Sequence, residues 1–263
     1  MPADAATAAA AGATAADPAV VDAIHAVLTG PADRAARWLA AAARRGHTEA
    51  QAIFGQWLLD GRGVERNPAE ALFWFKTAAL SGHAMAANML GRCYEHGWGA
   101  PACDKTAAHW YARAADAGLD WGQYNYATRL QLGRGIPADR ARAFALFQAA
   151  AAQGHAKSIN VLGGFYEDGW EVEADTAMAL RCYLRAAAGG DFRGQFNAAR
   201  LLALANHADD ALGWMQAVPR TAASRIGTPF SRRRAMFSST TMASSTTKPV
   251  ATVIAISDRL SML

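Results

Sequence analysis

Three histidines that recur at one position of a repeated sequence are the first candidates for metal chemistry. His47, His83 and His155 are separated by one or two periods of 36 residues. Zinc binds its nitrogen ligands at about 2.0–2.1 Å from a single ion. If the copies are pairs of helices, neighbouring copies lie two packing steps of about 8–10 Å apart, so their histidines cannot share an ion. We interpret these histidines as turn residues and predict no metal site and no cofactor.

Thiol chemistry is the second possibility, but the cysteines lack the spacing that it requires. Cys93, Cys103 and Cys182 do not form an even, regular set, which argues against a disulfide framework and favours the reducing cytoplasm. Cys93 and Cys103 lie ten residues apart, whereas a redox pair has the Cys-x-x-Cys spacing. The sequence also lacks a recognisable nucleophile–base pair, phosphate-binding loop or carboxylate pair. It therefore predicts a protein that is not an enzyme and has no small-molecule substrate.

The basic charge of the chain is confined to its C-terminal end. The formal net charge is +4, and the residues from Arg220 onward hold seven Lys or Arg and one Asp, which leaves a net charge of −2 before them. The run Arg232–Arg234 keeps nucleic-acid or acidic-lipid binding through charge as an alternative. Few aromatic residues accompany it, with Phe230 before the run and Phe237 after it. No apolar run approaches the roughly 18 residues that span a bilayer, so no membrane segment is expected.

A period of 36 residues organises the chain from Arg34 to Ala203. Each copy carries two adjacent alanines shortly before a glycine. These glycines are Gly46, Gly82, Gly118, Gly154 and Gly190. A fixed period of this length is the signature of a solenoid, and alanine is the strongest helix former. We therefore predict an all-α, right-handed superhelix of about five helix-turn-helix repeats.

Each repeat is expected to contain two helices, which in the first copy run from about Asp33 to Arg45 and from about Thr48 to Asp60. Gly46 ends the first helix, because glycine adopts the left-handed conformation at little cost. Small residues in the second helices should allow close contact with the first helices. These small residues are Ala50, Ala86, Gly122, Ser158 and Gly194. Aromatic residues should fill the remaining core, namely Trp38, Trp74 and Trp110 at one position and Phe75, Tyr111, Phe147 and Tyr183 at the next.

Helix caps mark the start of the first helices in later copies. Asn67, which precedes a proline, is expected to cap one helix, and Asp139 and Asp175 occupy the same position. Cys103 interrupts this series, and we expect the neighbouring Asp104 to cap in its place.

Three segments are predicted along the chain. Residues 1–17 form a disordered, alanine-rich leader, and residues 220–263 form a disordered, basic tail rich in serine and threonine. Residues 18–219 form the repeat array, with a capping helix at Pro18–Leu28 that covers the first exposed face and a short last helix at Asp209–Val218.

The repeated residues resemble the Sel1-like repeat family, a relative of the tetratricopeptide repeat. The fullest copy contains Ala71, Trp74, Ala78-Ala79, Gly82-His83, Ala86, Leu90-Gly91, Tyr94, Gly97 and Gly99. The copies depart from this pattern at Leu119 and Asp191 in the histidine position, at Leu146 and Cys182 in the tryptophan position, and at Glu171 in the second-glycine position. Known members mostly act as adaptor scaffolds for protein complexes. The resemblance thus implies a scaffold that binds a partner protein or peptide.

A hydrolase is the alternative that the resemblance leaves open. One branch of the family pairs cysteines within every repeat and has been linked to β-lactam binding and hydrolysis. This chain lacks those pairs, so we favour the scaffold, as a cytoplasmic monomer.

The residues that vary between copies are the best candidates for partner binding. Three positions on the first helices, spaced three or four residues apart, form a stripe separate from the core positions. This first-helix stripe contains Arg37, Arg44, Phe73, Leu80, His109, Arg113, Arg181 and Arg185. Arginine and aromatic residues are enriched in binding hot spots. The alternative is a solvated face whose residues vary freely, and the exposed apolar pair Phe73 and Leu80 favours binding.

Overall fold

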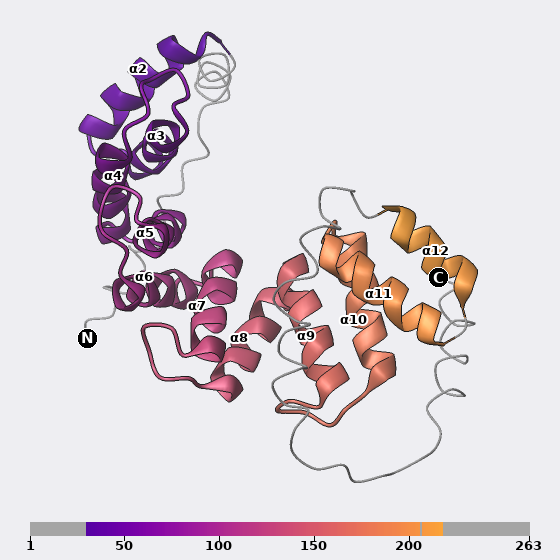
Figure 1. The fold of residues 1–263 in the computed structure, drawn as a ribbon. Helices are drawn as coiled ribbons and strands as arrows, with labels where there is room; N and C mark the ends of the chain where they lie inside the picture. Colours follow the sequence, from indigo (N-terminus) through magenta and orange to yellow (C-terminus); the bar gives the residue numbers. More distant parts are fainter. Residues whose placement is uncertain (1–29, 206, 218–263) are drawn as a thin grey trace, which may run out of the picture.

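The computed structural model describes residues 30–205 and 207–217 of the 263-residue chain (Figure 1). Its helices are α2 (Ala32–Arg44), α3 (Thr48–Asp60), α4 (Pro68–Leu80), α5 (Ala84–His96), α6 (Asp104–Asp116), α7 (Asp120–Leu132), α8 (Arg140–Ala152), α9 (Ala156–Asp168), α10 (Thr176–Ala188), α11 (Phe192–Leu204) and α12 (Ala208–Ala217). No strand occurs in the two described ranges. The predicted leader, the helix predicted at Pro18–Leu28 and the predicted tail 220–263 lie outside them.

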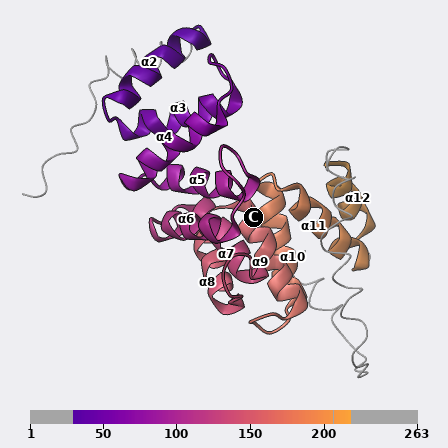
Figure 2. The same ribbon diagram turned by 60° about the vertical axis from the view of Figure 1, so that its left-hand side comes forward.

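The helices stack in chain order into an open, curved array (Figures 1 and 2). Each helix packs against the next, from α2 at one end to α12 at the other. The prediction of an all-α solenoid of about five repeats is confirmed. None of the described helices is both long enough and apolar enough to cross a membrane. Below, the first helices of the repeats are α2, α4, α6, α8 and α10, and the second helices are α3, α5, α7, α9 and α11.

The helix ends follow the residues that predicted them. In the first copy, α3 has the expected bounds, and α2 is displaced by one residue. Gly46 and Gly61, which follow these helices, have φ angles of 90° and 72°. This left-handed conformation is strained for other residues. The predicted caps Asn67, Asp139 and Asp175 are confirmed, because each side chain accepts a hydrogen bond from the backbone N–H three residues later.

The prediction that Asp104 caps α6 is wrong. Cys103 holds the cap position, and its side chain makes no capping hydrogen bond. The Asp104 carboxylate instead pairs with Arg129 of α7, which also pairs with Glu95 of α5 at 2.6 Å. The position of Arg129 holds Trp57, Cys93, Phe165 and Leu201 in the other copies. The two carboxylates compensate the burial of this charge and link α5, α6 and α7.

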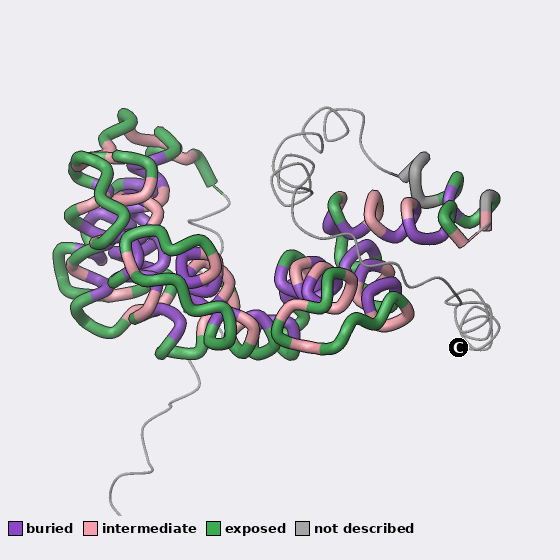
Figure 3. The backbone as a smooth tube through the Cα atoms, turned by 60° about the horizontal axis from the view of Figure 1, so that its bottom comes forward, coloured by how far each residue is buried: buried purple, intermediate pink, exposed green. Residues whose placement is uncertain are grey.

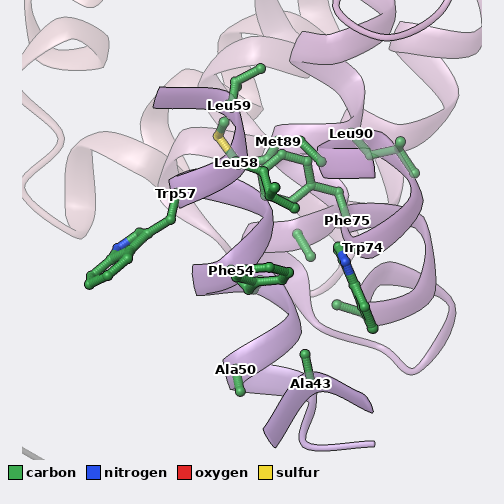
Figure 4. Packing of buried hydrophobic residues seen from close by; sticks show 14 of the residues in the cluster. Ala43, Ala50, Phe54, Trp57, Leu58, Leu59, Trp74, Phe75, Met89 and Leu90 are labelled. Atoms are coloured by element: carbon green, nitrogen blue, oxygen red, sulfur yellow. The ribbon is translucent and has the colours of Figure 1, made fainter. Parts of the chain in front are cut away.

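Small residues allow the helices to approach closely, as predicted. A Cβ atom added at Gly122 would lie 2.6 Å from the Cβ of Ala114. Larger side chains fill the remaining space between repeats. Figure 4 shows Phe54 of α3 beside Trp74 of α4, and the two rings meet edge to face at 6.0 Å between centroids. This contact joins the cores of the first two repeats, and the buried hydrophobic residues of the described array form three successive clusters.

The expected burial of Trp38 is wrong. Its side chain is 39% exposed, whereas Trp74 at the same position of the next copy is 9% exposed. Trp74 is covered by Phe54, which belongs to the second helix of the preceding repeat. The residues that would cover Trp38 in the same way precede residue 30, outside the described ranges.

The second helices lie on the inner side of the curve. Among them, α5 packs against α7 and α9 against α11. The Nδ2 of Asn125 donates a hydrogen bond to Oδ1 of Asn88 at 2.8 Å, and Asn197 donates to Asn160 at 3.0 Å. In a curved stack the inner elements lie closest together, and Figure 1 shows α3 and α5 inside α2, α4 and α6. Figure 3 shows buried residues between the helix layers and exposed residues along the turns and outer faces.

Candidate protein-binding surfaces

The first-helix stripe lies on the outer side of the array. Its eight residues are all exposed, Arg37 and Arg44 on α2, Phe73 and Leu80 on α4, His109 and Arg113 on α6, and Arg181 and Arg185 on α10. The same three positions on α8 hold the exposed alanines Ala145, Ala149 and Ala152. The structure therefore places six of the residues on three successive first helices. It separates Arg181 and Arg185 from them by a helix without large side chains at these positions.

An apolar pair forms the centre of the stripe. Phe73 and Leu80 are 57% and 60% exposed. Being seven residues apart on α4, they lie on one face of the helix about 10 Å from each other. The ring of Phe73 packs edge-on against Trp74, with 5.1 Å between centroids, which limits its motion. Arg37 occupies the same position as Phe73 on the preceding first helix, so an exposed aromatic ring lies near exposed positive charge.

The arginines of the stripe differ in how firmly the array holds them. Arg37 pairs with Asp33 at 2.9 Å, and both side chains are more than half exposed. Such surface pairs contribute about 0–1 kcal/mol, so Arg37 can exchange this partner easily. The Arg113 guanidinium lies 5.2 Å from the ring centroid of Trp110. In contrast, Arg185 donates a hydrogen bond to the carbonyl oxygen of Ala151 at 3.0 Å, which ties it to α8.

A second exposed surface lies at the N-terminal ends of α7, α9 and α11, and the sequence pattern did not identify it. Trp121, Lys157 and Arg193 are the second residues of these helices, and all three are exposed. The Nζ of Lys157 lies 4.7 Å from the ring centroid of Trp121. In the five copies this position holds Glu49, Met85, Trp121, Lys157 and Arg193. This variation is the same signal that identified the first-helix stripe. We refer to Trp121, Tyr124, His155, Lys157 and Arg193 as the second-helix site.

The recurring histidine position caps three of the five second helices through its side chain, and His47 before α3 makes no side-chain capping hydrogen bond. The Nδ1 of His83 accepts a hydrogen bond from the N–H of Ala86 at 3.0 Å. The Nδ1 of His155 accepts one from the N–H of Ser158 at 3.3 Å. Asp191 in the same position caps α11 through its carboxylate. Within residues 30–205 and 207–217, no three His, Cys, Asp or Glu side chains gather closely enough to hold a metal ion.

His155 carries a buried nitrogen without a partner. The residue is 6% exposed, and because Nδ1 accepts the Ser158 N–H, the proton of the neutral ring must be on Nε2. This Nε2 has no hydrogen-bond partner among the described residues. Burial lowers the pKa of His155, and its ring packs against Trp121 and Tyr124 at 4.6 and 4.9 Å between centroids. The Ser158 hydroxyl lies 2.9 Å from Nδ1 but is fully buried, so a substrate cannot reach this pair.

The three cysteines are free and lie in different environments. Cys93 is buried, and burial raises the pKa of its thiol to about 11. Cys103 is exposed, and a hydrogen bond from the Thr106 hydroxyl lowers its pKa. Cys182 is half-buried. The cysteines therefore do not form the pairs within repeats on which the hydrolase alternative depends.

Comparison with protein families matches five segments of the chain to the Sel1 repeat. The segments are residues 32–47, 48–83, 84–119, 122–155 and 156–191, and together they cover more than half of the chain. Segments 48–83 and 84–119 each contain a second helix and the following first helix, so they have the predicted period in a shifted phase. No curated protein matches the chain.

Two solved structures of repeat proteins resemble the array. A Sel1 repeat protein from Oxalobacter formigenes is 25% identical, with a TM-score of 0.69, and the match covers 80% of this chain and 85% of that one. The protein c5321, a protective antigen of uropathogenic Escherichia coli with an SLR fold, is 27% identical with a TM-score of 0.63. That match covers 76% of this chain but only 45% of the antigen, so the chain spans less than half of that protein.

Proposed function

We propose that this chain, which belongs to the Sel1 repeat family, is a non-catalytic scaffold that binds a partner protein or peptide through the first-helix stripe. Sel1 repeat proteins are generally scaffolds for protein interactions. The observation that carries the proposal is the exposure of Phe73 and Leu80, each more than half accessible on one face of α4. A partner that covers them removes two large apolar side chains from water, and full burial of each side chain contributes about 1.5–3 kcal/mol.

Affinity capture from the lysate of the source cell tests this proposal, with the full chain as bait. Charge reversal of Arg37, Arg113 and Arg181 to glutamate, or replacement of Phe73 and Leu80 by serine, should abolish capture of a partner that the wild-type bait retains. Both variants should keep the wild-type circular dichroism spectrum, because all five side chains are exposed.

A matched control carries the same change in charge elsewhere. Arg62, Arg134 and Arg140 are exposed and lie outside the stripe, in the loops after α3 and α7 and at the start of α8, so their reversal to glutamate should leave capture unchanged. Equal capture by the wild-type bait and both stripe variants would show that the first helices do not form the binding surface.

We further propose that the scaffold is a cytoplasmic monomer. The three free cysteines, one of them exposed, support a reducing compartment. Sedimentation that does not depend on concentration is the expected result for a monomer. The hydrolase alternative is tested with a chromogenic β-lactam, and turnover by the purified chain would contradict the non-catalytic assignment.

A further inference from the structure

The second-helix site combines charge, aromatic surface and an unsatisfied donor on the inner side of the array. Trp121, Lys157 and Arg193 form an exposed row across three successive second helices. We propose that this site binds an extended acidic segment of a partner protein, with carboxylates on Lys157 and Arg193 and an apolar side chain against Trp121. The proposal depends on the scaffold function for the source of the segment, but it concerns a different surface from the first-helix stripe.

Both cations of the site are available to a ligand. Among the described residues, neither Lys157 nor Arg193 forms an ion pair within 4.0 Å. The nearby acids already bind helix ends, because Asp120 accepts a hydrogen bond from the N–H of Trp121 at 2.7 Å and Asp191 caps α11. Burial raises the pKa of Asp191, whereas the N–H of Gly194 and the charges of Arg193 and Lys157 lower it, so both cations already lie near this carboxylate without forming an ion pair. The carboxylates near the site therefore form no ion pair with Lys157 or Arg193, and an acidic ligand can provide carboxylates that do.

Side chains from helices two repeats apart meet at this site. Burial raises the pKa of Tyr124 of α7, whereas the charge of Arg193 of α11 lowers it and that of Asp191, which precedes α11, raises it. Both residues therefore lie close to the Tyr124 ring. The Tyr124 ring also packs on His155, which precedes α9. The N-terminal ends of α7, α9 and α11 thus converge on the inner side of the curve, where one ligand can contact all three.

The unpartnered nitrogen of His155 indicates what kind of group is missing. A buried N–H without an acceptor is unfavourable, and His155 Nε2 is such a donor. Its neighbours Trp121 and Tyr124 are aromatic rings, which accept a hydrogen bond only weakly. A carboxylate oxygen is a strong acceptor, and because Nε2 is buried beneath Trp121, an acidic ligand supplies this partner when the Trp121 ring moves aside.

The spacing of the cations suits an extended peptide. The helices α9 and α11 pack against each other, which places their axes about 8–10 Å apart, and three residues of an extended chain span about 10 Å. Acidic residues three positions apart can therefore reach Lys157 and Arg193, with a flanking apolar residue on the Lys157 side near Trp121. Single-stranded nucleic acid also combines charge and stacking. It carries a phosphate at every nucleotide, and the carboxylates of the half-buried Asp120 and the buried Asp191 beside the site disfavour that continuous charge.

The test uses the full chain and a fluorescent peptide with blocked ends, of sequence Glu-Phe-Gly-Glu-Phe-Gly-Glu, in which the acidic residues are three positions apart. The neutral peptide Gln-Phe-Gly-Gln-Phe-Gly-Gln and a single-stranded oligonucleotide serve as comparison ligands. Fluorescence anisotropy should show that the wild-type chain binds the acidic peptide more tightly than both. Double reversal of Lys157 and Arg193 to glutamate should weaken this binding about tenfold, since two attractions become repulsions. Replacing Trp121 by alanine should weaken it as well, and Trp121→Phe should restore part of the loss.

A matched control separates this inference from the scaffold proposal. Reversal of Lys76 and Lys105 changes the charge equally on the outer surface and should leave peptide affinity unchanged. Equal binding by the wild type and the Lys157/Arg193 variant, tighter binding of the oligonucleotide, or no binding of the acidic peptide would each overturn the inference. None of these outcomes alters the capture experiment with the first-helix stripe, so the two proposals can fail separately.

Discussion

Replacing Arg129 by methionine is expected to destabilise the array by about 2–3 kcal/mol. The side chain is 3% exposed and pairs with Glu95 and Asp104. Removing one partner of a buried ion pair costs about 3–5 kcal/mol, because a buried charge loses its compensation. The Glu95 side chain is 29% exposed and also accepts a hydrogen bond from the Tyr111 hydroxyl. Water and this hydrogen bond therefore offset part of the penalty.

Urea unfolding followed by circular dichroism measures this effect in Arg129→Met and in the double variant Arg129→Met/Glu95→Gln. Removing both charges is close to neutral in many buried pairs, so the double variant should lie within about 1 kcal/mol of the wild type. Arg200→Met is the matched control. Arg200 pairs with Glu167 in an equivalent way but is 33% exposed, so its loss should cost less than that of Arg129.

Two results would refute this reasoning. One is a loss of less than about 0.5 kcal/mol in Arg129→Met, which is typical of a surface residue. The other is a double variant as unstable as the single one. That result would show that the loss of stability does not come from the charge of Glu95 left without its partner.

Three further substitutions test local features of the array. Glu171 has a φ angle of 59° where the first three copies have glycine, so Glu171→Gly should stabilise the protein by about 1 kcal/mol in urea unfolding, and a loss of stability would show that the backbone at Glu171 is not strained. A Cβ added at Gly91 would lie 2.6 Å from the ring of Tyr111, so Gly91→Ala should cost about 1–3 kcal/mol, and a neutral result would show that the ring can move. Burial lowers the pKa of His155 in the folded protein. The contribution of its neutral ring to folding stability is therefore fully present above about pH 6.5, the ordinary pKa of histidine, and is lost as the pH falls through the lower pKa of the folded state. His155→Asn keeps a capping side chain that does not titrate, so wild-type stability should fall relative to this variant on acidification, and parallel pH profiles would contradict this.

Sequence periodicity was sufficient for the architecture because the residues that define the repeat act locally. Gly46 and Gly61 end helices through their own backbone conformation, and Asn67 caps a helix through a residue three positions away. Such interactions depend on neighbours in the chain, so their positions can be predicted from the sequence alone.

The errors concern residues whose partners are distant in the sequence. Asp104 was expected to cap its own helix, but its carboxylate pairs with Arg129, 25 residues later. Trp38 was expected to be buried, but burial at that position depends on the preceding repeat. Neither partner can be assigned without the packing of neighbouring repeats.

The candidate site was only partly predictable. The exposure of Phe73 and Leu80 followed from helical spacing and is confirmed, whereas their role in binding stays a prediction. The second-helix site was missed, although Trp121 varies between copies as the stripe residues do. Its significance depends on the convergence of α7, α9 and α11 on the inner side of the curve, which no single repeat reveals.

The most direct test of the scaffold assignment is the Kd of a captured partner for the purified full-length chain, measured by isothermal titration calorimetry. We expect the Phe73→Ser/Leu80→Ser variant to bind at least tenfold more weakly than the wild type, because hot-spot side chains each contribute more than about 1 kcal/mol. The Arg62/Arg134/Arg140 reversal should bind within about twofold of the wild type, as expected for surface residues outside the contact. Equal affinities for the wild type and the Phe73/Leu80 variant would contradict binding through the first-helix stripe.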